Sequence, residues 1–309
     1  MSASSPLLLV VCGLHRSGTT FAGEILKRAG VCVIHEPLNQ RFGMVGIPIA
    51  YPFSENSNGV YAPLLDDAVN FARPWNKDVS HIGATGWKRR LYSLTGGRSG
   101  LRWERVRLLR SVGLQKSKVC LKDPFMSLAT PYLVREKGIR VICLIRHPAA
   151  IHYSTAKQNW RFDIGNLIRQ PELMEKYGND ISAVHWTLAK ENAAASIAIL
   201  WKLMVRINTQ LHSETGLKLV THEALCLEPV ETASQICSHF GIPFTPKLER
   251  YVLEHSGGAR VEAIGNRTHD FMRNSQALPD AWRGRLNAYD EAVMREIVGE
   301  EVISYYGQW

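Results

Sequence analysis

The stretch GLHRSGTT, residues 13–20, decides the fold prediction, because it joins a short apolar run to a segment of helical periodicity. The run 7–12 is continuous and apolar, as expected of a buried parallel strand. Residues 19–29 place apolar side chains at helical spacing, and Gly30 ends that segment. A tight strand-to-helix loop presents consecutive backbone N–H groups, and the helix start adds partial positive charge. We therefore interpret 13–20 as an anion-binding loop.

This loop differs from that of ATPases and GTPases at one position. The spacing resembles GxxxxGK[ST], but Thr19 occupies the lysine position. That lysine acts on the β- and γ-phosphates, so its absence argues against nucleoside-triphosphate hydrolysis. Arg16 supplies a cation inside the loop instead, and Gly13 and Gly18 let the backbone approach an anion. The alternative is an ordinary glycine-containing turn before a helix.

The rest of the chain also alternates strand and helix signals. We expect strands near 31–34, 119–121, 141–145 and 217–220, and long helices near 183–213, 229–240, 245–256 and 288–304. This alternation predicts an α/β, P-loop-type three-layer fold, with a central parallel sheet of about five strands flanked by helices. We expect a single domain over 1–309, with an irregular basic insertion at 41–117.

Composition and charge exclude several classes of protein. The 309 residues are 45% apolar and 21% charged, which excludes a disordered or fibrous chain. The net charge of +9 is concentrated, because the segment 73–118 carries +10 and the rest −1. The six cysteines have no CxxC spacing and lie mostly in apolar runs, as expected in a reducing compartment. With no signal-peptide pattern and no apolar run near ~20 residues, we expect a cytoplasmic protein.

The basic segment contains one predicted helix. Residues 101–114 bring Leu101, Arg105, Leu108, Leu109 and Val112 near one helical face. We expect that face to lie on the core, with a basic face in solvent. The alternative is an acceptor lid that attracts an anionic substrate or rests on a membrane. A nucleic-acid interface is disfavoured, because it leaves the loop 13–20 unexplained.

A second candidate anion site follows the predicted strand 141–145. Arg146 stands at its carboxyl end, Pro148 suits the first turn of a helix, and Ser154 lies on that helix. Ligands of open α/β sheets bind at the carboxyl ends of the strands, where the loop 13–20 also lies. Two anion sites on one edge indicate a ligand with two separated anionic groups. The alternative makes Arg146 a structural ion-pair residue and Ser154 a surface residue.

Together these segments resemble the sulfotransferase superfamily that uses 3′-phosphoadenosine 5′-phosphosulfate (PAPS). RSGTT at 16–20 matches the family's [KR]-S-G-[ST]-[ST] loop for the 5′-phosphosulfate, and Arg146 with Ser154 matches the spacing of its 3′-phosphate element. HEPL at 35–38 resembles carbohydrate sulfotransferases, and LKDPF at 121–125 resembles protein-tyrosine sulfotransferases. HEAL at 222–225, FGIPF at 240–244 and Trp282-Arg283 fit later motifs. The resemblance covers 7–37, 119–160 and 217–290, and the RxGxxG signature of the cytosolic branch is missing.

The resemblance implies PAPS as the sulfuryl donor, 3′-phosphoadenosine 5′-phosphate (PAP) as the product, and no metal requirement. It implies a nucleotide site built from His15, Arg16, Ser17, Gly18, Thr19, Thr20, Arg146, Ser154, Thr268 and Arg273. Trp282 either stacks near the adenine or belongs to the core, and we favour the core.

Three residues are the catalytic candidates. Glu36 is the expected base, placed beside the loop if its strand neighbours the first strand, or else a capping carboxylate. Arg16 is expected to stabilise the leaving 5′-phosphate oxygens. Lys122 either contacts the transferring sulfuryl group or pairs with Asp123 or another carboxylate.

The acceptor is left open between a carbohydrate, a phenol, and a lipid or secondary metabolite, either anionic or lipid-linked. We expect 41–117 to build its site and expect no nucleic-acid partner, and a peripheral membrane contact stays open as an alternative. The alternative functions are a P-loop small-molecule kinase and a non-catalytic nucleotide- or polyanion-binding protein. The oligomeric state is not indicated by the sequence.

Overall fold

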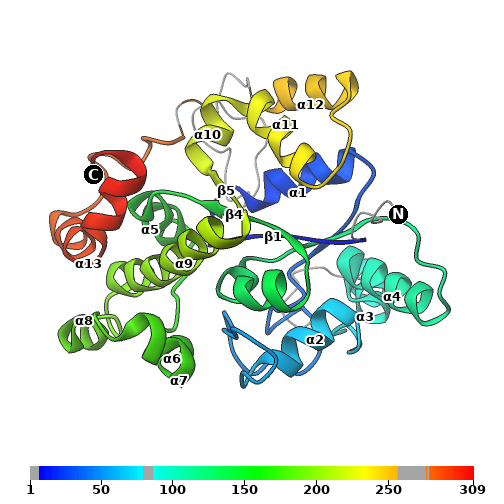
Figure 1. Ribbon diagram of the computed structural model, residues 1–309, viewed down its shortest axis with the longest axis horizontal. Coiled ribbons are helices and arrows are strands. Elements are labelled where there is room, and N and C mark those ends of the chain that lie inside the picture. The colour runs from blue at the N-terminus through cyan, green and yellow to red at the C-terminus, as the bar shows by residue number, and fades with distance from the viewer. Residues whose placement is uncertain (1–6, 79–85, 257–275, 277) are drawn as a thin grey trace.

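A five-stranded parallel sheet forms the centre of the computed structural model, which describes residues 7–78, 86–256, 276 and 278–309 (Figure 1). The strands run in the order β2-β3-β1-β4-β5 and every pair is parallel. Their bounds are β1 Leu8–Gly13, β2 Cys32–His35, β3 Val119–Lys122, β4 Arg140–Ile145 and β5 Lys218–Thr221. The predicted three-layer α/β class is confirmed, and all five strands lie where the sequence predicts them.

Two layers of helices cover the two faces of the sheet, because alternate residues of each buried strand face opposite sides. Leu9 and Val11 of β1 belong to a core with α1 Thr19–Arg28, α10 His222–Leu227, α11 Pro229–His239 and α12 Pro246–Ser256. Val10 and Cys12 belong to the larger core, with α2 Ala62–Asn70, α4 Gly97–Ser111, α5 Pro148–Ala156, α9 Ala193–Thr215 and α13 Ala288–Tyr306. Figure 1 shows α1 and α10–α12 on one side of the sheet and α2, α5 and α9 on the other.

Short elements complete the second layer and connect the strands. They are α3 Gly86–Thr95, η1 Pro124–Leu128, η2 Tyr132–Glu136, α6 Gly165–Ile168, α7 Pro171–Leu173, η3 Met174–Gly178 and α8 Ala183–Leu188. The single helix predicted near 183–213 is therefore wrong, since α8 and α9 are separate. The break follows from Asn192, whose side chain accepts a hydrogen bond from the Ala195 N–H and begins α9 as an N-cap. All six cysteines are free, and five of them are buried.

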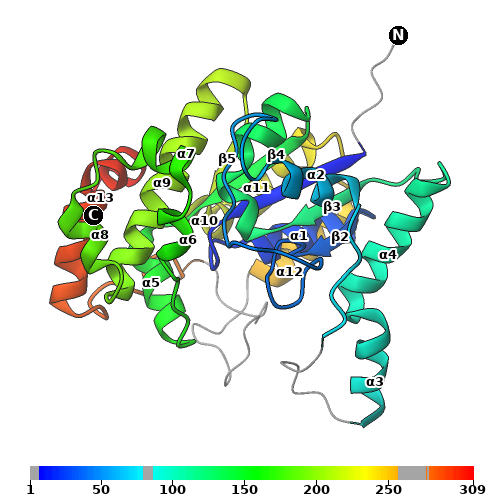
Figure 2. The ribbon, with the colours of Figure 1, turned by 90° about the horizontal axis from the view of Figure 1, so that it is seen from below.

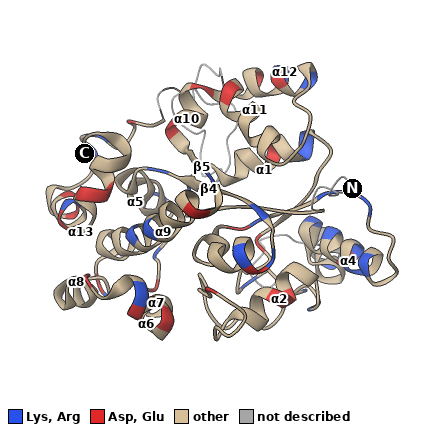
Figure 3. Cartoon of the chain, in the orientation of Figure 1, with Lys and Arg blue, Asp and Glu red and all other residues tan. Residues whose placement is uncertain are grey.

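The insertion 41–117 holds the helices α2, α3 and α4, and the last two project from the body of the molecule (Figure 2). The predicted orientation of α4 is wrong. Trp103 and Val106 are the buried side chains of α4, whereas Leu101, Leu108 and Val112 are 53%, 65% and 56% exposed. The reason is close packing through glycine: a Cβ on Gly100 would lie 2.7 Å from Trp75 Cδ1. Figure 3 shows several Lys and Arg positions, in blue, along α4.

Candidate active site

The loop between β1 and α1 has the backbone geometry of an anion site. Gly13 has φ 125°, and a Cβ there would lie 2.2 Å from the Leu144 carbonyl oxygen, so only glycine fits. Gly18 has φ 90° and is the N-cap of α1. The Phe21 N–H donates to the Gly18 carbonyl at 3.0 Å, so the N–H groups of residues 18–20 precede the first intrahelical bond. Such N–H groups, with the helix dipole behind them, bind anions.

The side chains of the loop divide between supporting it and lining it. Ser17 is fully buried, and its Oγ donates to the Leu14 carbonyl at 2.6 Å, which closes the loop on itself. Thr19 is buried and Thr20 is half-buried at the first turn of α1. Arg16 takes a left-handed backbone conformation, φ 71°, that costs a non-glycine residue on the order of 1–3 kcal/mol. Such backbone strain is typical of ligand-binding loops.

Arg16, Arg146 and Ser154 form one connected group in front of this loop. Arg16 Nε donates to Ser154 Oγ at 2.8 Å, across from α5. Arg146, which follows β4, donates from Nη1 to the Arg16 carbonyl oxygen at 2.8 Å. Arg146 is only 9% exposed, and its Nη2 lies 3.5 Å from the Leu278 carbonyl oxygen. The two segments that the sequence identifies as separate anion sites are therefore in direct contact.

Glu36 is linked to the same edge of the sheet through Lys122, which the sequence does not predict. The condition that its strand neighbours the first strand is not met, because β3 lies between β2 and β1. Lys122, the last residue of β3, bridges the gap: its Nζ donates to Glu36 Oε1 at 2.8 Å. Asn39 Nδ2 donates to Glu36 Oε2 at 2.9 Å, so both carboxylate oxygens accept hydrogen bonds. Lys122 was expected either to contact the transferring sulfuryl group or to pair with a carboxylate. In the structure it forms an ion pair with Glu36 rather than with Asp123.

The electrostatics of this edge are dominated by burial and by the Lys122 charge. Burial raises the pKa of the Glu36 carboxyl, but the Lys122 ammonium and the hydrogen bonds from Lys122 and Asn39 outweigh it and hold the pKa at about 2. Burial raises the pKa of Asp123 to about 7, even though its oxygens accept from the N–H groups of Leu38 at 2.7 Å and Phe125 at 2.9 Å. The pKa of Glu36 therefore lies well below that of its neighbour Asp123.

His15 belongs to the loop, yet its ring lies among aromatic side chains. Its Nδ1 shares a hydrogen bond with the Tyr51 hydroxyl at 2.6 Å. The Phe125 and Trp160 rings lie edge-on to it, with centroids at 4.8 and 6.1 Å. Burial lowers the pKa of His15 to about 4, and the Lys122 and Arg16 charges add to this against the opposing charge of Glu36. The imidazole is therefore neutral at pH 7.

Two side chains near the loop were not predicted as site residues. Tyr51 comes from the insertion 41–117, which no motif covers. His222 is 7% exposed, and its Cδ2 lies 3.2 Å from where a Cβ on Gly18 would stand. Burial, followed by the charges of Arg146 and Arg16, holds the pKa of His222 well below its ordinary value. The motif HEAL at 222–225 was the available signal for His222, and Tyr51 had none.

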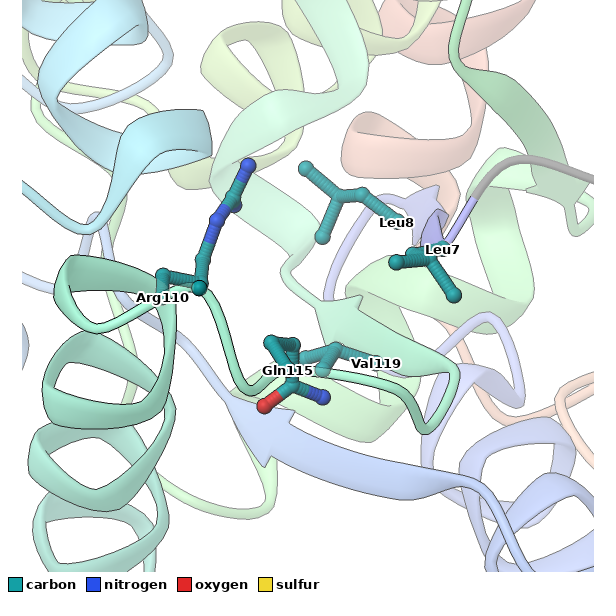
Figure 4. Close-up of a pocket in the computed structure, with 6 residues that line it drawn as sticks. Leu7, Leu8, Arg110, Gln115 and Val119 are labelled. Atoms are coloured by element: carbon teal, nitrogen blue, oxygen red, sulfur yellow. The ribbon is translucent and has the colours of Figure 1, made fainter.

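Of the remaining sequence candidates, the structure describes Trp282. Thr268 and Arg273 fall outside the described residues. Trp282 is buried and stacks on His147, with centroids 4.5 Å apart, so the preference for a core position is confirmed. A pocket at the amino ends of β1 and β3 is on the opposite edge of the sheet from the loop (Figure 4). It is lined by Leu7, Leu8, Arg110, Gly113, Gln115 and Val119. In the part of the chain that the structure describes, no helix is long and apolar enough to cross a membrane.

Comparison with known proteins gives one family match. The family described as "Sulfotransferase family" matches residues 6–246. No match was found among curated proteins. Among solved structures, the sulfotransferase domain of the Curacin biosynthetic pathway is 13% identical, with a TM-score of 0.45, over 97% of this chain and 98% of that chain.

Two further solved structures are similar. The sulfotransferase domain of the Synechococcus PCC 7002 olefin synthase is 14% identical, with a TM-score of 0.47, over 99% of this chain and 97% of that chain. Sulfotransferase STF9 from Mycobacterium avium is 14% identical, with a TM-score of 0.42, over 98% of this chain and 78% of that chain.

Proposed function

The chain belongs to the sulfotransferase family, and we propose that it transfers a sulfuryl group from PAPS to an acceptor hydroxyl in one in-line step. One observation carries the proposal. At a helix-start anion loop, the Arg16 guanidinium donates to the Ser154 hydroxyl and the Arg146 guanidinium donates to the Arg16 carbonyl oxygen. A donor with a 5′-phosphosulfate and a 3′-phosphate needs two anion contacts of this kind.

The nucleotide binds through the loop and its neighbours in this proposal. The backbone N–H groups of residues 17–20 and the Thr19 and Thr20 hydroxyls hold the 5′-phosphosulfate, with His15 at the same loop. Arg146 and Ser154 hold the 3′-phosphate, and Arg16 lies between the two groups. We extend the nucleotide site to Thr268 and Arg273 on the sequence resemblance alone.

The chemical step places Glu36 as the base. The acceptor oxygen forms a bond to sulfur while the bond from sulfur to the bridging 5′-phosphate oxygen breaks, and the electron pair leaves on that oxygen. Arg16 and the loop N–H groups stabilise the charge that develops there. The acceptor proton passes to a Glu36 oxygen, directly or through one water.

Lys122 links donor binding to the strength of this base. Its ammonium holds the pKa of Glu36 down to about 2 while the two are paired. A transferring sulfuryl group offers Lys122 an alternative anionic partner at the same edge. When Lys122 turns to that group, the effect of burial on Glu36 is no longer outweighed, and the pKa of Glu36 rises. Glu36 then gains basicity only when a donor is bound, which limits futile transfer to water.

The domain organisation remains part of the proposal. We treat 1–309 as one domain, in which 41–117 contributes to the acceptor site. Tyr51 supports this assignment, because it comes from that segment and bonds to His15 of the loop. Trp75 and Trp103 also pack into the larger core of the sheet.

A peripheral contact with an anionic membrane is a separate proposal, supported by the outer face of α4. Leu101, Leu108 and Val112 are more than half exposed there, beside the exposed cations Arg98 and Arg105. Exposed apolar and basic side chains on one helix face are typical of interfacial helices. Sedimentation with vesicles should show binding when they contain anionic lipid, and a Leu101→Ser/Leu108→Ser variant should lose it. Equal sedimentation of wild type and variant removes α4 from this role.

Turnover with PAPS tests the proposed function. Release of PAP in the presence of a mixed panel of hydroxyl acceptors should be measured without added metal, with ATP-Mg²⁺ as the competing donor. PAP release that falls when Arg146 is replaced by alanine supports the sulfotransferase. Product formation only from ATP-Mg²⁺ supports the small-molecule kinase. Nucleotide binding without turnover from either donor supports the non-catalytic alternative.

A further inference from the structure

Aromatic rings from several separate segments meet beside the anion loop. His15 comes from the loop after β1, Tyr51 from the insertion, Phe125 from η1 after β3, and Trp160 and Phe162 from the segment after α5. Tyr51 is buried and its ring lies 5.1 Å from Phe125 and 5.3 Å from Phe162. Phe125, Phe162 and His15 are only partly buried, and Trp160 is 41% exposed. We call these five side chains the aromatic wall.

The aromatic wall adjoins both the proposed donor site and the proposed base. The Arg16 guanidinium lies 5.9 Å from the centroid of the Trp160 ring. Glu36 and Lys122 are near enough that their charges shift the pKa of His15. A molecule resting against these rings therefore adjoins Arg16 of the proposed donor site and lies in the electric field of the proposed base.

A ring nitrogen of the wall, His15 Nε2, has spare hydrogen-bonding capacity. The Tyr51 hydroxyl holds His15 Nδ1 and fixes the ring orientation. For His15 Nε2, no hydrogen bond is found within the described residues, and this atom is not among the fully enclosed polar atoms. Because the ring is neutral near pH 7, Nε2 can make a hydrogen bond to a hydroxyl without attracting an anion.

From this arrangement we infer that the aromatic wall is the acceptor site, and that the acceptor is an aromatic hydroxyl compound of the phenol class. Its ring packs on Trp160 and Phe125, and its hydroxyl meets His15 and Glu36. This inference rests on the proposed function and names its acceptor. Tyr51 acts as a positioning residue, through His15.

The chemistry of the step favours the same acceptor class. A phenol has a pKa of about 10, whereas a hydroxyl of water-like acidity has one of about 15.7. The carboxyl and imidazole at this edge are weak bases, so the more acidic hydroxyl loses its proton more readily. The phenol oxygen bonds to sulfur as the bridging S–O bond breaks, the electron pair leaves with the 5′-phosphate, and the proton passes to Glu36. A sugar needs many polar partners, and the wall offers chiefly ring surface.

Binding and turnover together test the inference. We would titrate the PAP-saturated protein with 2-naphthol by calorimetry, and compare kcat/KM for 2-naphthol and methyl β-glucoside with PAPS. We expect 2-naphthol to bind and to be the better substrate. Trp160→Ala should weaken 2-naphthol binding about tenfold, as expected for the loss of one stacking ring, and PAP binding by much less. The control is Trp87→Ala. Trp87 lies on α3, which is not part of the aromatic wall, and its side chain is 70% exposed.

A second variant tests the role of His15 without removing a ring. Tyr51→Phe keeps the aromatic packing and frees His15, so kcat for 2-naphthol should fall more than binding, and its pH profile should change. Preference for the glucoside, or 2-naphthol binding untouched by Trp160→Ala, overturns the acceptor site and leaves the proposed function standing. Failure of PAP to bind and of PAPS to react with any acceptor overturns the proposed function instead.

Discussion

Removing the Glu36 carboxylate should destabilise the folded protein and also reduce its turnover. Glu36→Gln keeps the shape of the side chain but removes its charge, and Lys122 is only 3% exposed. The variant therefore leaves a buried ammonium without a counter-charge. We also expect turnover to fall by about 10²–10⁴-fold, the usual contribution of a general base.

The magnitude of the stability change follows from the shifted pKa. The pKa of Glu36 falls from 4.5 to about 2, and each unit corresponds to about 1.4 kcal/mol, so the carboxylate contributes about 3 kcal/mol at pH 7. Breaking a buried ion pair typically costs about 3–5 kcal/mol, which agrees in size. Because the folded-state pKa is depressed, the stabilisation is complete above pH 4.5 and is lost as the pH falls towards 2.

The assay is urea unfolding at pH 7, monitored by circular dichroism. Wild type would be compared with Glu36→Gln, Lys122→Met and the double variant. The double variant should recover part of the loss, since it buries no unpaired charge. Glu24→Gln is the matched control, because Glu24 is 17% exposed like Glu36 but pairs at 2.8 Å with Lys27, whose side chain is 38% exposed, so it should cost less than about 1 kcal/mol. A Glu36→Gln variant no less stable than the control, with no recovery in the double variant, would refute the reasoning.

Three further predictions follow from the same structure. Lys122→Met should raise the pKa of Glu36 from about 2, because the charge and the hydrogen bond of Lys122 no longer oppose burial, and the acid limb of the pH–rate profile should move to higher pH. Gly13→Ala should lose most folded protein in an expression and unfolding assay, because its Cβ would stand 2.2 Å from a carbonyl oxygen. Gly30→Ala, with open space at its Cβ and φ 88°, should cost only about 1–2 kcal/mol. Asp123 has its folded-state pKa raised from 3.8 to about 7, so its contribution to stability should rise as the pH falls from 7 towards 3.8, and Asp123→Asn should abolish that dependence in unfolding experiments.

The local features of this fold were predictable from the sequence. The apolar run before Gly13, the helix after Gly18 and the remaining strands are encoded by periodicity over a few residues. Their shared carboxyl edge follows from the rule for parallel sheets, which is why Arg16 and Arg146 were expected together. Direct contact between them through the Arg16 carbonyl oxygen was not predictable from that rule.

The features that the sequence missed depend on long-range packing. Strand order is set by tertiary contacts, so nothing local indicated that β3 separates β2 from β1 or that Lys122 would bridge to Glu36. The periodicity of residues 101–114 favoured the face with Leu101 and Leu108. The opposite face is buried because Gly100 allows α4 to approach Trp75, a contact that a count of apolar residues cannot detect.

The most direct test of the central claim is calorimetric titration with PAP. The account predicts tight binding without added metal, weakened by Arg146→Ala and by Ser154→Ala. Arg105→Ala on the exposed face of α4 is the control and should bind as the wild type does. Preference for ATP-Mg²⁺ with no PAP binding, or PAP binding equal in all four proteins, would contradict the assignment of this edge as the sulfuryl-donor site.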